Sequence, residues 1–252
     1  MGTVHFLSVE VGAERDGNTL LDDAVGTRWR TSRRSAATPN AEPVAWASVQ
    51  ECHQSTTRAP RLPATRLARV EVRPEAIRDR SAVRALHVAA FGEDHVPVVA
   101  NLVDALRDAV RRGEGLSLVA AERDQIVGHV MFSPSLLDAP KRLLPVQVLS
   151  PIGVVPERQN QGVGTALIRR GIELLSERDV PLVFLEGAPG YYSRFGFEPG
   201  AAHGFRKPSL RIPDAAFQVL RLPTYESWMT GTLVYAEAFW RHDAVGRRDP
   251  KA

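Results

Sequence analysis

The spacing of apolar residues divides the chain into an N-terminal part with little periodicity and a patterned remainder. Residues 1 to about 67 show little sustained periodicity, and from Thr27 onward they are rich in Arg, Ser, Thr, Ala and Pro. Such a segment buries too little apolar surface to offset the entropy of ordering it. We therefore expect a disordered extension at 1–67, a folded domain at 68–240 and a flexible tail at 241–252.

The first half of the patterned remainder predicts a strand, two helices and a hairpin. Residues 68–72 alternate as a half-buried strand does, and Pro74 fits the first turn of a helix that runs to about Phe91. A second helical pattern covers Val96 to Arg112, and Gly113 ends it. Two apolar runs on either side of a charged turn then predict the hairpin strands, Leu116–Ala121 and Ile126–Phe132.

The second half predicts a crossover unit, in which a helix connects two parallel strands. A long apolar strand at Val146–Val155 is followed by a helix at Gln161–Arg178 and another strand at Pro181–Leu185. Such a unit places the turn before its helix at the carboxyl end of a buried strand, where open α/β sheets bind ligands. The remaining apolar segments predict a short helix at 190–194, a strand at 217–222, and at 232–239 either a strand or a helix.

The turn before the crossover helix has the composition of a phosphate site. The strand breaks at Pro156, and the helix begins behind Gly162 and Gly164. The first turn of a helix leaves backbone N–H groups without intrahelical acceptors, and the peptide dipoles add partial positive charge there. Glycine has no side chain to block an approaching anion.

Two common nucleotide motifs do not fit this turn. A dinucleotide fingerprint requires a third glycine where this chain has Leu167, and a P-loop requires a Gly-Lys pair, which the chain lacks. The pattern that remains is Gln-x-x-Gly-x-Gly at Gln159, Gly162 and Gly164.

Composition narrows the class of protein. With 252 residues, 44% of them hydrophobic and 24% charged, the chain is typical of a globular protein. It has no apolar run that could cross a bilayer and no signal-peptide pattern, so we expect a cytoplasmic protein without a membrane partner. Cys52 is the single cysteine, which excludes a four-thiolate metal site, and no metal is expected. A formal charge of +3 does not indicate a nucleic-acid partner.

At this point the chain resembles the GNAT superfamily of N-acetyltransferases. Residues 159–164 match the acyl-CoA motif of that family in register, and 151–157 are similar to the strand and Val-x-Pro junction that precede it. Residues 191–197, Tyr-Tyr-Ser-Arg-Phe-Gly-Phe, resemble the block that closes the family core, and Tyr235 and Phe239 are similar to a bacterial branch. The resemblance implies an α/β fold with a mixed sheet of about six or seven strands, about four flanking helices and a splayed parallel strand pair.

The resemblance also implies where acyl-CoA binds. Pro151 is expected to mark a bulge that splays two parallel strands, so that pantetheine pairs with backbone around Ile152 and Val154. Tyr192 matches the acid that protonates the leaving thiolate, and Tyr191 matches a packing position. The pyrophosphate is expected on the turn and first helical residues, namely Gln159, Asn160, Gln161, Gly162, Val163, Gly164 and Thr165.

The general base is less well specified by these patterns. Glu186 ends a predicted strand near the expected thioester, although a carboxylate at such a place is usually solvated. His203 or a chain of water molecules are alternatives. Related members often have a polar residue at the position of Ala188, and this departure puts any inherited substrate contact in doubt.

The function implied is an acetyl-CoA-dependent N-acetyltransferase that moves an acetyl group directly to a primary amine. The acceptor is left open between small-molecule and peptide amines, and the assembly between monomer and homodimer. A non-catalytic acyl-CoA-binding or regulatory module is the alternative, and Tyr192 discriminates between the two because only the enzyme needs an acid.

Overall fold

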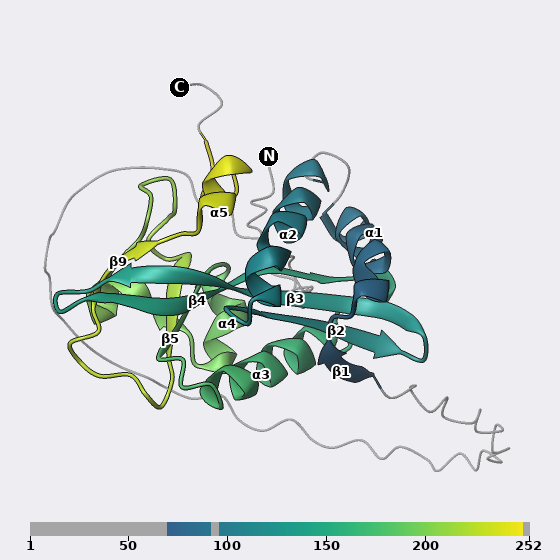
Figure 1. Cartoon of the computed structure of the whole chain (residues 1–252), viewed down its shortest axis with the longest axis horizontal. Helices are drawn as coiled ribbons and strands as arrows, with labels where there is room; N and C mark the ends of the chain where they lie inside the picture. Colours follow the sequence, from purple (N-terminus) through teal and green to yellow (C-terminus); the bar gives the residue numbers. More distant parts are fainter. Residues whose placement is uncertain (1–69, 92–95, 249–252) are drawn as a thin grey trace, which may run out of the picture. The chain divides into compact units, whose positions relative to one another are not determined.

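A computed structural model describes residues 70–91 and 96–248 of the chain (Figure 1). The extension predicted at 1–67 lies outside the described residues, as do the last four residues of the predicted tail.

The core of the domain is a mixed sheet of nine described strands. The strands are β1 Glu71–Pro74, β2 Leu116–Glu122, β3 Gln125–Asp138, β4 Leu143–Val154, β5 Leu182–Glu186, β6 Glu198–Pro199, β7 Phe205–Arg206, β8 Phe217–Arg221 and β9 Gly231–Val234. Neighbouring strands follow the order β1-β2-β3-β4-β5-β8-β6, while β9 pairs with β3 and β7. Among these described strands, only the pairs β4 with β5 and β7 with β9 are parallel.

This sheet confirms the predicted fold class. The strand count exceeds the expected six or seven because β6 and β7 have two residues each, too few to produce a periodic pattern. The ambiguous segment at 232–239 contains both kinds of element, since β9 ends at Val234 and a helix begins at Glu237.

Helices cover both faces of the sheet (Figure 1). One face packs against α1, α2 and α5, and the other packs against α3, so each face buries its own hydrophobic cluster. The longest described helix, α2, has 16 residues, and no helix in the described ranges is long and apolar enough to cross a membrane. The helices are α1 Arg80–Phe91, α2 Val96–Arg111, α3 Val163–Ser176, α4 Pro189–Tyr192 and α5 Glu237–Arg241, with short 3-10 turns η1 Ile77–Asp79, η2 Pro156–Arg158, η3 Ser193–Phe195 and η4 Gly200–His203.

The helix predicted from Pro74 begins later, at Arg80. Pro74 itself remains in β1, where it pairs with Leu118. The carboxylate of Asp79 accepts a 2.8 Å hydrogen bond from the backbone N–H of Ala76, which stabilises a turn between strand and helix. The prediction therefore identified the helix and misplaced its start.

The parallel strands β4 and β5 pair only over a short stretch. Their register joins Gln147 to Val183 and Val148 to Phe184, although β4 continues to Val154. The Ser150–Pro151 peptide bond is cis, and a register shift lies opposite it in β3. The two strands thus separate after Val148, as a proline bulge at this point predicts.

The C-terminal segment differs from the flexible tail expected from residue 241. Phe239, Ala244 and Val245 are all buried within the cluster on the α1 and α2 face. The segment that follows α5 is therefore part of the core as far as Val245.

Buried polar side chains lie between α1 and the sheet. His87 of α1 is 1% exposed and His129 of β3 is fully buried, and the two rings are joined by a 2.8 Å hydrogen bond. Burial lowers the pKa of both histidines, most strongly that of His87. The fold therefore disfavours the protonated form of both rings.

Packing of α3 on the sheet generates a first prediction. A Cβ atom at Gly171 would overlap the ring of Phe132, so Gly171→Ala is expected to destabilise the fold by about 1–3 kcal/mol. Gly190→Ala is the matched control, because nothing lies within 4 Å of a Cβ there. Urea denaturation measures both, and equal free energies of unfolding for the two variants would contradict this packing.

The histidine pair generates a second prediction, concerning acid stability. As pH falls below the ordinary histidine pKa of 6.5, the unfolded chain takes up protons that the folded chain does not, so the free energy of unfolding falls. Glu75, whose pKa is lowered to about 2, has the same sign of effect but acts only below its ordinary pKa of 4.5.

As pH falls from 6.5 to 4.5, we therefore expect the free energy of unfolding to decrease less steeply in His87→Phe than in wild type. Urea denaturation at several pH values measures both slopes. His242→Phe, outside this pair, serves as the control. Identical slopes for wild type and His87→Phe would show that His87 is not held neutral.

Candidate functional site

The turn after β4 has the backbone conformation of an anion cradle. Asn160 and Gly162 both have left-handed φ values, 60° and 84°, and α3 begins directly afterwards at Val163. Nothing lies within 4 Å of a Cβ at Gly162, so its positive φ rather than crowding accounts for the glycine. By helix geometry, the first-turn N–H groups of α3 have no intrahelical acceptor.

Side chains of the loop hold it in shape. The amide of Gln159 donates a 3.1 Å hydrogen bond to the carbonyl of Val154, and that of Gln161 donates a 2.8 Å hydrogen bond to the carbonyl of Glu157. Arg158 pairs with Glu122 at 2.7 Å, so its charge is already compensated. The side-chain amides of Gln159 and Gln161 are thus both engaged within the loop that joins β4 to α3.

A strand edge leads from this cradle into the domain. On one edge of β4, Ile152 pairs with Val130 and Val154 pairs with Gly128. On the other edge, pairing with β5 ends at Val148, and no further β4–β5 pair occurs in the described sheet. Backbone groups along this second edge can therefore accept an extended ligand as an additional strand.

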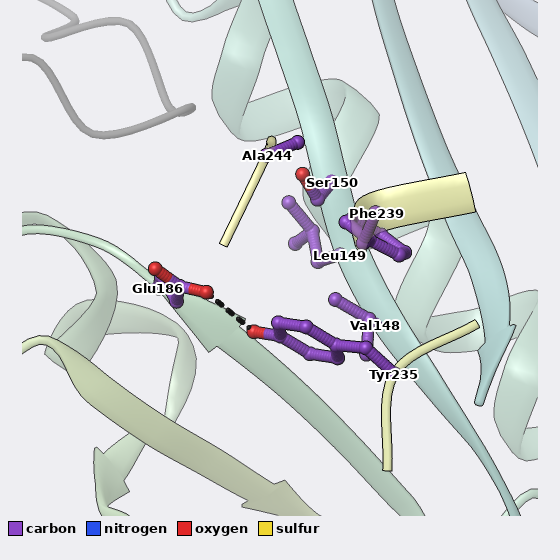
Figure 2. A pocket seen from close by; sticks show the side chains of 7 residues that line it. All are labelled: Val148, Leu149, Ser150, Glu186, Tyr235, Phe239 and Ala244. Atoms are coloured by element: carbon purple, nitrogen blue, oxygen red, sulfur yellow. Dashed lines mark hydrogen bonds between the residues drawn. The ribbon is translucent and has the colours of Figure 1, made fainter. Parts of the chain in front are cut away.

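A small cavity lies where β4 and β5 separate (Figure 2). Its volume is about 10 Å³, comparable to one water molecule. Figure 2 shows the Glu186 side chain at the end of β5 directed toward the hydroxyl of Tyr235. The lining residues are Val148, Leu149, Ser150, Glu186, Tyr235, Phe239 and Ala244.

Glu186 is the ionisable group of this cavity. Its carboxylate accepts a 2.8 Å hydrogen bond from the Tyr235 hydroxyl and a 3.2 Å hydrogen bond from the backbone N–H of Gly246. Burial raises the pKa of Glu186, and the two hydrogen bonds and nearby Arg211 only partly oppose this rise. Glu186 is half-buried rather than fully solvated, because Tyr235 and Gly246 of the C-terminal segment both contact its carboxylate.

The tyrosine pair lies on α4, just beyond β5. Tyr192 is 1% exposed and packs edge to face against Phe197, with ring centroids 5.9 Å apart. Tyr191 is half-buried beneath Arg194, whose guanidinium lies 3.9 Å from the ring centroid. Tyr192 does not line the Glu186 cavity, so the structure brings one of the two predicted catalytic residues into it.

Six of the seven cavity residues were missed by sequence reasoning as site residues, among them Val148 and Leu149 of β4. Ser150 lies beside the expected bulge, whereas Tyr235, Phe239 and Ala244 come from the C-terminal segment. The sequence signal for these residues was the resemblance of Tyr235 and Phe239 to a bacterial branch of the family, and that resemblance assigned no function to either residue. His203, the alternative base, lies outside the cavity lining and pairs with Glu198 at 2.9 Å.

Comparison with known sequences agrees with this geometry. Residues 71–200 match the model of the acetyltransferase (GNAT) domain. The chain is 37% identical over 162 residues to YjhQ of Escherichia coli K12, an uncharacterised N-acetyltransferase, covering 63% of this chain and 88% of that protein. It is 36% identical over 130 residues to YhbS of the same organism, also uncharacterised, covering 50% of this chain and 75% of that protein.

Solved structures extend the comparison to complexes. The Escherichia coli YhbS structure with CoA aligns with a TM-score of 0.61 and 33% identity, covering 71% of this chain and 97% of that chain. A GNAT acetyltransferase of Brucella melitensis with acetyl-CoA aligns with a TM-score of 0.54 and 32% identity, covering 68% and 99%. With its phosphate-type cradle, its open strand edge and these relatives, the chain belongs to the GNAT family of acetyltransferases.

Proposed function

We propose that this protein is an acetyl-CoA-dependent N-acetyltransferase that moves an acetyl group directly to a primary amine bound beside Glu186. The observation that carries the proposal is the open edge of β4, which runs between the Gly162 cradle and the half-buried Glu186 carboxylate. The relatives solved with CoA and with acetyl-CoA support the choice of co-substrate.

The residues of the chain fit acetyl-CoA in three places. Backbone N–H groups at residues 161–165 would hold the pyrophosphate, with Gln159 and Asn160 shaping the turn. The backbone at Ile152 and Val154 would pair with pantetheine along the open edge. The thioester would then lie near the cavity at the strand separation, where it supplies the acyl group.

Glu186 suits the role of general base. The Glu186 carboxylate first takes a proton from the acceptor ammonium, and the neutral amine nitrogen then forms its bond to the thioester carbon. As the carbon–sulfur bond breaks, the nitrogen loses its second proton and the leaving thiolate gains one. The raised pKa of Glu186 makes it a stronger base than an exposed carboxylate. The donors from Tyr235 and Gly246 stabilise its ionised form.

Tyr192 is proposed as the acid that protonates the leaving thiolate. Its position in the 191–197 block matches that role, and its burial keeps bulk water from the ring. Because Tyr192 does not line the Glu186 cavity, the acid and base would act from different sides of the thioester. This separation also motivates the alternative, an acyl-CoA-binding module without catalysis.

An acceptor screen tests the proposal and separates it from the alternative. Wild type is expected to release free thiol from acetyl-CoA with at least one primary amine, and Tyr192→Phe is expected to lower kcat by about 100-fold or more. The neighbouring Tyr191→Phe, which removes the same atom from a packing residue, is the control. Full activity of Tyr192→Phe across pH would reject this acid, and acetyl-CoA binding without turnover by wild type with every amine would favour the module.

The pH profile of kcat tests Glu186. Activity is expected to rise with pH as the carboxylate ionises, and Glu186→Gln is expected to lower kcat by about 100-fold or more. Tyr235→Phe removes a hydrogen bond that favours the charged form, so the acidic limb should move to higher pH. Tyr225→Phe is the matched control. If the acidic limb of the kcat profile stays in place or moves to lower pH in Tyr235→Phe, Glu186 is not the general base.

A further inference from the structure

A chain of hydrogen-bonded side chains runs through the domain on the face opposite α3. The hydroxyl of Ser117 lies 2.6 Å from Oε2 of Glu75 and 2.9 Å from Nε2 of His129. Nδ1 of His129 lies 2.8 Å from Nε2 of His87. We call these four residues, Glu75, Ser117, His129 and His87, the histidine relay; they come from the turn after β1, from β2, from β3 and from α1.

The hydrogen-bond direction within the histidine relay follows from its acidic end. The pKa of Glu75 is lowered to about 2, because nearby His129 and the hydrogen bonds from Arg107 and Ser117 outweigh the effect of burial, so its carboxylate can only accept. Ser117 must therefore donate to Glu75 and accept from Nε2 of His129.

A neutral imidazole has one donor and one acceptor nitrogen, which sets the direction of the remaining bond. Since His129 donates from Nε2, its Nδ1 is the acceptor, and Nε2 of His87 donates to it. The other nitrogen of His87, Nδ1, is then left without a proton. The relay thus selects one tautomer of each histidine.

This unprotonated nitrogen faces the strand that we assign to acyl-CoA. A Cβ atom at Gly153 of β4 would lie 3.0 Å from Nδ1 of His87, so the missing side chain makes room for the edge of the ring. Nδ1 is buried and has no hydrogen-bond partner among the described residues. Gly153 lies between Ile152 and Val154, the residues whose backbone would pair with pantetheine.

On balance, the surroundings of His87 oppose its protonation. Arg107 of α2 and His129 of β3 disfavour a positive charge at His87, and Glu75 favours one. On its own helix the nearest ring is the uncharged Phe91, 5.7 Å between centroids, and on β4 the neighbour is Gly153. Burial is the largest influence and lowers the pKa of His87 well below its ordinary value.

We propose that His87 is a positioning residue for acyl-CoA binding. The histidine relay holds the His87 ring with its unprotonated Nδ1 edge against Gly153. This contact keeps β4 in the backbone conformation that accepts pantetheine. The proposal rests on the proposed function, because it assigns the open edge of β4 to acyl-CoA. Apolar side chains would pack α1 against the sheet without the desolvation that buried polar groups require. A relay that fixes one ring orientation is useful where the neighbouring backbone must be held in place.

The first experiment tests the relay itself and needs no activity. Nitrogen-15 NMR of the histidine rings separates protonated from unprotonated ring nitrogens. At neutral pH we expect Nδ1 of His87 and Nδ1 of His129 to be unprotonated, and the signals of His87 to shift when CoA is added. A proton on Nδ1 of His87, or signals that stay unchanged while CoA binds, would overturn the proposal.

The second experiment measures CoA affinity by calorimetry in variants that cut the relay at different distances from β4. His87→Gln removes the ring edge, and Ser117→Ala breaks the link to Glu75 far from Gly153. Both are expected to weaken CoA binding and raise the KM for acetyl-CoA by about tenfold, with kcat at saturation within about twofold of wild type. Ser117→Thr, which keeps the hydroxyl, should restore wild-type affinity, and Val88→Gln on the exposed side of α1 should not alter it.

The outcomes separate this inference from the proposed function. If wild type binds CoA and the folded variants bind it within about twofold of wild type, the positioning role is rejected and the proposed function stands. If Ser117→Thr loses as much affinity as Ser117→Ala, packing rather than the hydroxyl is responsible, and the role is again rejected. If His87→Gln does not fold, the two Ser117 variants decide. If wild type binds no CoA, both proposals fail.

Discussion

The end of strand pairing between β4 and β5 at Val148 is the constraint on which the rest of the site depends. In a continuous sheet, every backbone group of β4 would be satisfied by its neighbours, and no edge would be open to a ligand. β4 continues to Val154 without β5, past a register shift in its pairing with β3. The glycine turn follows β4 and Glu186 ends β5, so both proposed parts of the site adjoin the separation.

The elements around this opening hold it in place rather than fill it. On one face, α3 packs closely enough on β3 that Gly171 contacts the ring of Phe132. On the other face, α1 inserts the ring of His87 beside Gly153. The C-terminal segment contacts the end of β5, where Tyr235 and Gly246 both donate to Glu186. The opening is thus surrounded by rigid packing, which is the arrangement expected of a preorganised binding site.

The fold could be predicted from sequence wherever one element carries a full period of apolar residues. The crossover unit and the hairpin were recognisable for this reason, and the glycine turn could be narrowed to one motif by residues that it lacks, such as a third glycine at Leu167. Two-residue strands such as β6 carry no period, and the extension of β3 past Phe132 was hidden by Pro134, which pairs with Gln147.

The cavity was harder to predict than the cradle. The cradle residues are consecutive, so a sequence motif can identify them. Glu186 and its hydrogen-bond donor Tyr235 are far apart in the sequence and meet only through tertiary packing. The burial of Glu186 depends on the segment after α5, whose short apolar stretch at Ala244 and Val245 has no periodic signature. The histidine relay is likewise assembled from separate elements, and nothing in the local pattern around His87 indicates it.

The central claim is that the open edge of β4 and the turn that follows it bind acyl-CoA. Hydrogen–deuterium exchange of backbone amides, measured with and without acetyl-CoA, tests this most directly. The account predicts slower exchange at residues 149–154 and 159–165 on addition of acetyl-CoA, and unchanged exchange in the β1–β2 strand pair at the far edge of the sheet. Binding of acetyl-CoA with protection elsewhere and none along β4 would contradict it.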